Sequence, residues 1–474
     1  MKIHLQTLIG LMVFAVAARL LSFFPSVINH DESTYLVIAQ TLLQGYTYFV
    51  DYIDTKPPGI FWILAGFLAV FGKSIVLFRA FVAIIIATTA FGLYLIQLTM
   101  GQSRKVALGT ALIYILLSSL FTFYGISPNT ETFFNCFTVF AFWLVLSKRR
   151  GWTYLLAGFL LGAGFMIKYV VVFDAAAFGV WLLWEQVVKR RNWGIFWGRA
   201  FALIAGFLIV PGITLMYYHQ QNTLETWWFH SVIVSSRYPE LHQWQDYFIF
   251  PMDFFLRFLP VTLFYLLVLR TKRIGRETKI PYLIWSGFAF FSVMLPGNAY
   301  GHYFIQFMLP FSLLAGLIWS LTPEELPAWM RWIHQKIILR RTLVGFVVLT
   351  LFFQYNDYLK KPDYPKLIAN YLQPKMQVTD NLYTGNGSQI LYLLLNKKVP
   401  NKYVHPSLFW EEKHLTAMEI DIEAEVGTIQ ASRPKYVIIK DELWDDRFDS
   451  WLETSYHLDT TFREGRIKIM ERND

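Results

Sequence analysis

Carboxylates stand close to the ends of apolar segments at two places in this chain. Asp31 and Glu32 follow the first long apolar run, and Glu131 begins a later one. Adjacent carboxylates beside a membrane segment are costly unless water or a partner satisfies them. A carboxylate can take the proton from a hydroxyl as that hydroxyl attacks a carbon centre, so these acids are candidate bases. The alternative is that each acid only favours the positive end of its own helix.

Basic and polar aromatic side chains lie near the same predicted boundary. Lys168 interrupts an apolar stretch, and Arg19 and Arg79 lie inside apolar runs, where each needs an anionic partner. The other members of this group are Lys56, Arg237, His302 and Tyr303, and the acid Asp54 lies two residues before Lys56. Cationic side chains can hold a departing phosphate and offset its growing charge. For Lys168 the alternative is a lysine that only extends its ammonium group to the membrane surface.

The composition indicates which elements position these residues. Of the 474 residues, 55% are hydrophobic and only 16% are charged, and apolar runs long enough for a bilayer recur to about residue 355. The mean hydropathy is +0.39. The net charge of +9 comes mostly from short clusters between apolar runs, not from one continuous basic face, so nucleic-acid binding is excluded. The single cysteine, Cys136, lies in an apolar run and is predicted to be a small packed hydrophobe.

Basic clusters set the predicted orientation. Placed in the cytoplasm by the positive-inside rule, they require two helices between each consecutive pair. The clusters lie at 104–105, 148–150, 189–199, 270–279 and 331–341. The predicted spans are residues 5–24, 75–100, 106–124, 132–146, 154–167, 169–188, 201–218, 254–269, 280–295, 302–321 and 342–355. A removed signal peptide is the alternative for the first run, but the run continues past the small residues of that site.

One further apolar stretch is predicted to lie along the outer membrane surface. Residues 57–72 would form a helix of about 24 Å, which is shorter than a bilayer core of ~30 Å. The stretch belongs to an outer segment, 25–74, that also contains a predicted amphipathic helix at 33–44. Residues 125–131, 220–253 and 296–301 complete the predicted outer surface. The N-terminus is predicted to be cytoplasmic.

The tail is predicted to be a soluble α/β domain on the outer side. Residues 435–439 are a strand candidate, and residues 457–462 and 466–471 flank a turn as a hairpin. The predicted fold class is therefore a polytopic α-helical membrane protein with about eleven spans and a small extracytoplasmic α/β domain. The predicted domain bounds are 1–355 and 356–474.

Several motifs, in their order, make the chain resemble the GT-C membrane glycosyltransferases. Within that superfamily it is similar to the group that joins protein O-mannosyltransferases, aminoarabinose transferases and the RgtA/B/C/D-like enzymes. The similarity spans roughly residues 1–320. The matching motifs are His30-Asp31-Glu32-Ser33-Thr34-Tyr35, Asp54-Thr55-Lys56-Pro57-Pro58-Gly59, Leu77-Phe78-Arg79, Ser127-Pro128-Asn129-Thr130-Glu131, residues 162–168, and His302-Tyr303 through Pro310. The residues Gly385-Asn386-Gly387-Ser388 also resemble bacterial members.

The resemblance implies a role for each matched residue. It implies Asp31 as the base, Glu32 as an assisting or acceptor-positioning residue, and Glu131 as a second acid, although several relatives carry Asp there. Lys56 stands where the family places a phosphate contact, and Arg79 lies in the matching helix. Some relatives place an acid directly before Lys-Pro-Pro where this chain has Thr55, which puts a role for Asp54 in doubt. Phosphate binding is also expected of Lys168, His302 and Tyr303, with Arg19 and Arg237 as further candidates.

The expected reaction is an inverting sugar transfer from a polyprenyl-phosphate donor to a hydroxyl acceptor at the outer face of a bacterial inner membrane. The acceptor can be a glycan, a lipid or a protein, and membrane lipid is the other expected partner. The resemblance implies no essential cofactor, with a divalent cation left open. The tail either recognises the acceptor or caps the outer cavity. A transporter of an anionic or lipid-linked substrate and a non-catalytic scaffold are the rival interpretations.

Overall fold

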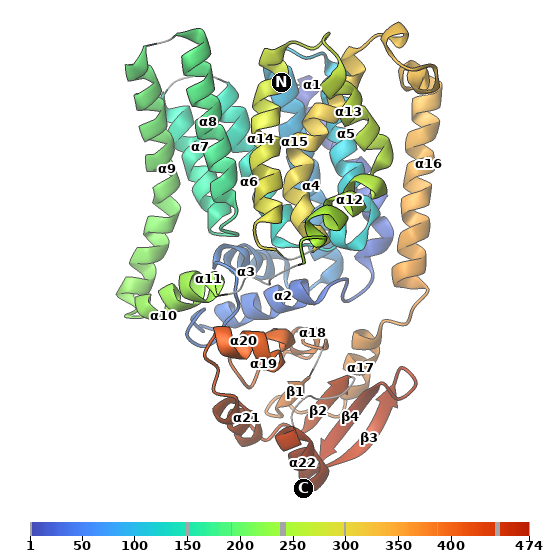
Figure 1. Cartoon of the computed structure of the whole chain (residues 1–474). Helices are drawn as coiled ribbons and strands as arrows, with labels where there is room; N and C mark the ends of the chain where they lie inside the picture. Colours follow the sequence, from blue (N-terminus) through green and yellow to red (C-terminus); the bar gives the residue numbers. More distant parts are fainter. Residues whose placement is uncertain are drawn as a thin grey trace. The chain divides into compact units, whose positions relative to one another are not determined.

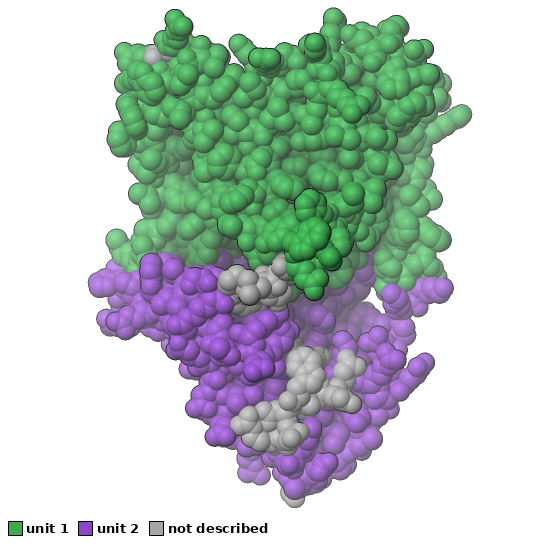
Figure 2. All heavy atoms as spheres, viewed as in Figure 1, with its two compact units in different colours: residues 1–23, 79–216, 240–357 green, residues 24–78, 217–239, 358–474 purple. Residues whose placement is uncertain are grey.

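The computed structural model describes residues 2–147, 151–190, 192–237, 243–297, 300–385, 387–440 and 446–473. The predicted basic cluster at 148–150, Arg191 and Asn386 lie outside these residues. The chain forms two compact units, coloured separately in Figure 2. Unit 1 comprises residues 1–23, 79–216 and 240–357, and unit 2 comprises residues 24–78, 217–239 and 358–474.

Unit 1 is a bundle of long helices that run roughly along one direction (Figure 1). Its helices follow the predicted apolar runs. They are α1 (Lys2–Arg19), α4 (Ile75–Thr99), α5 (Arg104–Leu120), α6 (Thr130–Leu146), α7 (Gly151–Phe165), α8 (Val171–Lys189), α9 (Trp193–Gln220), α12 (Asp246–Arg257), α13 (Leu259–Arg270), α14 (Arg276–Met294), α15 (Phe304–Gly316) and α16 (Lys336–Gln354). The ends of α4 and α9 extend into unit 2.

Helix α15 is the centre of this bundle. Every one of its residues is buried, and it packs against α5, α6, α13 and α14. A helix that is apolar all round is expected in such a fully enclosed position. Some polar groups inside the bundle are paired with backbone carbonyls: Gln97 donates from Nε2 to the Leu313 carbonyl at 2.8 Å. Asn135 likewise donates to the Ile305 carbonyl at 2.8 Å.

Glycines bring α7 and α9 into close contact. Gly158 and Gly162 are four residues apart on α7, where a Cβ atom would collide with the backbone of Leu203 and Phe207 on α9. Gly206 on α9 has the reciprocal relation to the backbone of α7. Small residues at this spacing let helix backbones approach closely, a common way to pack helices in membranes.

The predicted single helix at 254–269 is wrong, because the chain bends there. Helices α12 and α13 meet at an angle of 100° at Phe258. Pro260 at the start of α13 has no N–H to continue the hydrogen bonding of α12. Thr262 partly replaces the lost bonding by donating from its hydroxyl to the Phe255 carbonyl at 2.9 Å.

Six helices in the described ranges are long and apolar enough to cross a bilayer, and α12 with α13 would make a seventh span if counted as one. The six are Ile3–Phe23, Ile75–Thr99, Val171–Lys189, Trp193–Gln220, Gly301–Ser320 and Lys336–Leu372. Shorter apolar helices occur at Gly59–Phe71, Thr130–Leu146 and Gly151–Phe165. The total of eleven spans stays a prediction.

Unit 2 is assembled from three stretches of chain. Its first stretch forms α2 (His30–Leu43) and α3 (Gly59–Phe71), which pack against each other. Residues 32–41 of α2 are all buried, so the predicted amphipathic character of this helix is wrong. Its second stretch forms α10 (Leu224–Trp228), a π-helical turn (Phe229–Ile233) and α11 (Val234–Ser236).

The third stretch of unit 2 contains a four-stranded sheet. Its strands are β1 (Leu382–Thr384), β2 (Tyr436–Lys440), β3 (Tyr456–Phe462) and β4 (Ile467–Arg472), in the order β1-β2-β4-β3. Strand β1 pairs parallel with β2, and the other two pairs are antiparallel. The predicted strand and hairpin are thus confirmed. The accompanying helices are α17 (Tyr364–Leu372), α18 (Ile390–Leu394), α19 (Pro406–Trp410), α20 (Glu412–Ala417), α21 (Ile422–Ala431) and α22 (Asp446–Ser455).

Candidate active site

Asp31 lies in the first turn of α2, beside a histidine from the third stretch of unit 2. Its Oδ1 is 3.4 Å from Nε2 of His405, and both side chains are about one-fifth exposed. An acid that is mostly buried but still reached by solvent can receive a proton from a bound hydroxyl. Asp31 is therefore well placed to act as a base.

The hydrogen bonds around His405 fix which nitrogen carries the proton. The backbone N–H of Ser407 donates to Nδ1 of His405 at 3.3 Å, so Nδ1 must be an acceptor. In the neutral imidazole the proton then lies on Nε2, the nitrogen that faces Asp31. His405 therefore directs an N–H, not a lone pair, toward the carboxylate of Asp31.

His30 precedes Asp31 but stays uncharged at neutral pH. Burial lowers the pKa of His30, and the nearby charge of Lys440 lowers it further. Gly387 lies against this ring: its φ is +77°, and a Cβ atom there would come within 2.9 Å of the His30 ring. The glycine of the predicted motif at 385–388 thus leaves room for the residue before the candidate base.

Glu32 caps α2. Its Oε1 accepts hydrogen bonds from the backbone N–H groups of Ile28 at 2.5 Å and Asn29 at 3.3 Å, and the side chain is 1% exposed. Together with Asn29 this forms a capping box, which satisfies N–H groups that the first helical turn cannot pair. The expected assisting role of Glu32 is therefore indirect, through the position of Asp31.

Lys56 and Asp54 form a second cluster in unit 2. Nζ of Lys56 is 3.3 Å from Oδ1 of Asp54 and 5.9 Å from the ring centre of Tyr35. Tyr48 donates from its hydroxyl to the carbonyl oxygens of Asp54 and Lys56 at 3.0 and 2.6 Å, which holds this turn in place. Oδ2 of Asp54 is buried and makes no hydrogen bond to any described residue. The cluster thus presents a cation and a free acceptor oxygen.

Glu131 and Lys168 form an ion pair in unit 1. Lys168 donates from Nζ to Oε1 of Glu131, which is 1% exposed, and Thr130 donates to the other oxygen at 3.1 Å. The same Nζ lies 4.0 Å from the ring centre of Tyr303, and the ring of His302 is 4.7 Å from that of Tyr303. Four predicted site residues from α6, the α7–α8 connection and the start of α15 are therefore brought together.

The buried arginines of unit 1 have different surroundings. Arg19 donates to three backbone carbonyls: that of Ser118 in the last turn of α5, and those of Gly125 and Ile126 in the connection to α6, at 2.6, 3.0 and 2.6 Å. The partial negative charges of these carbonyl oxygens take the place of the anionic partner that was expected for Arg19. Arg79 lies in α4 with 2% of its surface exposed.

Arg237 makes its contacts with other residues of unit 2. It pairs with Glu419 at 2.6 Å and lies 5.6 Å from the ring centre of Phe229. The two acid–cation clusters belong to different units, with Asp31 and Lys56 in unit 2 and Glu131 and Lys168 in unit 1. The single cavity expected to join them stays a prediction.

Two polar centres were missed from the sequence. His405 gave no signal because nothing local in the tail links it to Asp31. Asp174 did give one, as an acid within the apolar run 169–188: it is fully buried and accepts from Trp285 Nε1 at 2.6 Å and Gln306 Nε2 at 2.7 Å. Across the described ranges, no three His, Cys, Asp or Glu side chains are grouped to hold a metal ion.

Known proteins with related sequences are membrane sugar transferases. The family model described as dolichyl-phosphate-mannose-protein mannosyltransferase matches residues 55–217. An undecaprenyl phosphate-alpha-4-amino-4-deoxy-L-arabinose arabinosyl transferase from Photorhabdus laumondii is 28% identical over 149 residues. That match spans 29% of this chain and 27% of the relative, so it covers only part of either protein.

The similarity to solved structures covers the whole length. Two crystal structures of ArnT from Cupriavidus metallidurans, one in the apo state and one bound to undecaprenyl phosphate, match with TM-scores of 0.67 and 0.66. Each match covers 97% of this chain and 97% of the ArnT chain, at 15% sequence identity. The chain has the GT-C fold. The GT-C resemblance of the sequence motifs is thereby confirmed, and the apolar helices make this a multi-pass membrane protein.

Proposed function

We propose that this chain is an inverting glycosyltransferase that moves a sugar from a polyprenyl-phosphate donor to a hydroxyl acceptor. The observation that carries the proposal is the GT-C fold shared with ArnT over nearly the full length of both chains. The family model over residues 55–217 supports the same chemistry, since its description names a lipid-phosphate sugar donor. A transporter is not favoured, because the related proteins are named as transferases.

Asp31 is the proposed base. The acceptor hydroxyl oxygen attacks the anomeric carbon from the face opposite the phosphate, and its proton passes to a carboxylate oxygen of Asp31. The bond between the anomeric carbon and the phosphate oxygen breaks, and its electron pair leaves with polyprenyl phosphate. The configuration at the anomeric carbon inverts. The N–H of His405 is directed at Asp31 before the attack.

The cations are the proposed partners of the leaving phosphate. Lys56 is one-quarter exposed, so its ammonium group can reach a bound anion while it is still near Asp54. A cation at this position offsets the charge that grows on the departing phosphate. In unit 1, Lys168 and Arg79 are proposed to complete the phosphate site, and Glu131 orients Lys168 through the ion pair.

The proposed orientation places this chemistry on the outer face of a bacterial inner membrane. An odd number of spans, eleven, with a cytoplasmic N-terminus puts residues 356–474 outside as a small α/β domain. The positions of the basic clusters support this orientation. The donor must then be a sugar already carried across the membrane on a lipid.

Incubation of the purified protein with polyprenyl-phosphate sugars tests the proposal. The wild-type protein should release polyprenyl phosphate. An Asp31→Asn variant should lose about 10²- to 10⁴-fold in kcat, the usual contribution of a general base. An Asp51→Asn variant is the matched control, since Asp51 only accepts a backbone hydrogen bond from Thr47 within the same segment. Equal turnover by the Asp31→Asn variant would remove Asp31 as the base.

A further inference from the structure

Unit 2 contains an open cavity of about 330 Å³ that the proposed reaction does not use. Its volume lies within the range of about 300–1,000 Å³ that small-molecule sites have. All ten lining residues belong to unit 2, from its three stretches of chain. They are Phe49, Val50, Ile53, Thr226, Phe229, His230, Lys402, Tyr403, Met418 and Glu419.

Aromatic rings form much of the wall of this cavity. Phe49, Phe229 and Tyr403 line it, and the ring of His230 lies parallel to that of Phe49 with their centres 6.0 Å apart. Phe49 has a φ of +68°, which is costly for a bulky residue. Such strain persists where the surroundings hold a side chain in place, often at binding sites.

His230 supplies a polar group with nothing to bind. It is 7% exposed, and its Nδ1 has no hydrogen-bond partner among the described residues. Burial lowers the pKa of His230 to about 4, with a smaller contribution from Lys402, so the ring is neutral at pH 7. A buried polar atom without a partner is costly, and a ligand hydroxyl would satisfy it once the atoms that cover Nδ1 move aside.

Each charged group at the cavity has an opposite charge nearby, and for Glu419 the contact is an ion pair. Glu419 pairs with Arg237 at 2.6 Å, and the charge of Lys402 acts on the carboxylate of Glu425. The cavity therefore offers flat apolar faces, an unsatisfied neutral imidazole and balanced charges. These features suit a neutral ligand that has both C–H faces and hydroxyl groups.

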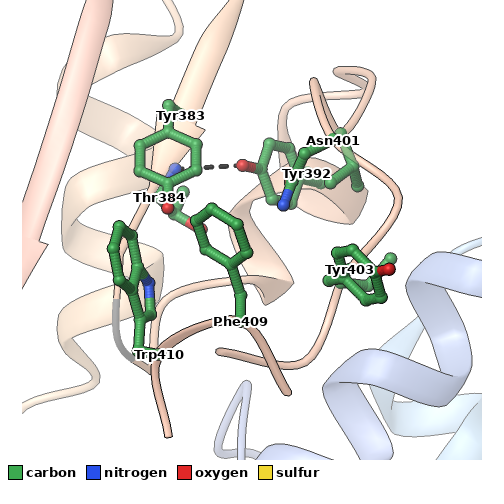
Figure 3. Close-up of a pocket in the computed structure, with 9 residues that line it drawn as sticks. Tyr383, Thr384, Tyr392, Asn401, Tyr403, Phe409 and Trp410 are labelled. Carbon is green, nitrogen blue, oxygen red and sulfur yellow. Dashed lines mark hydrogen bonds between the residues drawn. The ribbon is translucent and has the colours of Figure 1, made fainter. Parts of the chain in front are cut away.

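The neighbouring cavity in Figure 3 is a different kind of space. It measures about 10 Å³, room for about one water molecule, and Tyr403 is the residue that lines both cavities. Around it, Tyr383, Phe409 and Trp410 gather on one side, and the hydroxyl of Tyr392 accepts from the Thr384 N–H at 3.0 Å. A ligand is thus accommodated by the larger cavity.

We propose that the larger cavity binds a neutral saccharide unit of the acceptor. This inference rests on the proposed function, because a glycosyltransferase must hold a second substrate beside its donor. Two walls are close in sequence to candidate site residues: Ile53 precedes Asp54, the partner of Lys56, and Tyr403 lies two residues before His405, the neighbour of Asp31. A sugar held there would contact the same chain segments as these two residues.

The test measures the Michaelis constants of donor and acceptor separately. The donor is a radiolabelled polyprenyl-phosphate sugar, and the acceptor is the glycan and glycolipid fraction extracted from envelope membranes of the source organism. Phe229→Ala removes an aromatic face, and Thr226→Trp fills the cavity without removing a packed side chain. Each should raise the KM for the acceptor fraction about tenfold, while the KM for the donor stays within twofold.

Trp228→Ala is the matched control. Trp228 is an aromatic residue directly before Phe229, it is 52% exposed, and it does not line the cavity, so its variant should behave as the wild type. Unchanged acceptor KM in both cavity variants would overturn the inference and leave the glycosyltransferase proposal intact. A rise in donor KM alone would assign the cavity to the donor and overturn it as well. No release of polyprenyl phosphate by the wild type would instead contradict the proposed function.

Discussion

At the scale of single residues, the candidate base is defined by its partner more than by its own position. From the sequence, Asp31 could simply be an acid that stabilises the N-terminus of α2. In the structure Glu32 caps this helix instead. The Nε2–H of His405 faces Asp31 because Nδ1 is occupied by the Ser407 N–H. The different environments of Asp31 and Glu32 depend on contacts that the sequence motif does not reveal.

His405 should act as a positioning residue. In a His405→Ala variant kcat should fall about tenfold, because the carboxylate loses the N–H that lies 3.4 Å from its Oδ1. The acidic limb of the rate-versus-pH curve should move to higher pH, since a carboxylate without its donor gains a proton more readily. A His405→Gln variant, which can donate again, should recover part of the rate. An unmoved acidic limb in His405→Ala would limit His405 to a structural role.

At the scale of elements, close backbone contact replaces side-chain packing between α7 and α9. The glycines at 158, 162 and 206 allow this approach, and larger residues would force the helices apart. The same helices carry no buried ion pair between the glycines. Their association therefore depends on the absence of side chains at these three positions.

Gly206→Ala should destabilise the bundle. An added methyl group meets the backbone of α7, an overpacking expected to cost about 1–3 kcal/mol. Gly198→Ala, on the same helix but with open space around it, should be neutral or stabilising because Ala favours a helix by about 1 kcal/mol. Thermal unfolding of both variants in the same detergent gives the comparison. If the Gly206→Ala protein were as stable as the Gly198→Ala protein, the contact between α7 and α9 would have room for a methyl group.

Helices and strands could be predicted where a local sequence pattern determines them. Apolar runs gave the helices of unit 1, and alternation beside a turn gave β2, β3 and β4. The bend at Phe258 was missed although Pro260 was visible, because a proline near a helix start need not break the preceding helix. Strand β1 has three residues, too few for a pattern, and the burial of α2 depends on partners distant in sequence.

At the scale of the whole molecule, the proposal requires that both acid–cation clusters face one side of the membrane. The sequence predicts this through the basic clusters, since orientation depends on charge counts that are readable without a structure. The single cavity predicted to unite Asp31 with Glu131 stays a prediction, because no local pattern joins residues so far apart in sequence. Labelling in cells addresses the required sidedness directly.

Single cysteines in a Cys136→Ser background report that sidedness. Ser74→Cys and Phe123→Cys flank the two clusters, and Val378→Cys, at a position 97% exposed, reports the tail. A membrane-impermeant maleimide should label all three in intact spheroplasts. Arg273→Cys, in a predicted cytoplasmic cluster, should be labelled only after permeabilisation. Opposite labelling of Ser74→Cys and Phe123→Cys would end the model of a shared outer site.

The three-part construction of unit 2 has a consequence for biosynthesis. The first stretch, with Asp31, is translated early, whereas His405 is added near the end of the chain. At about 5–20 residues per second, the ribosome needs roughly 20–75 s to pass from one to the other. During that interval Asp31 lacks its neighbour His405. Under the proposed mechanism, chains cut short before residue 405 should therefore turn over no faster than the His405→Ala variant.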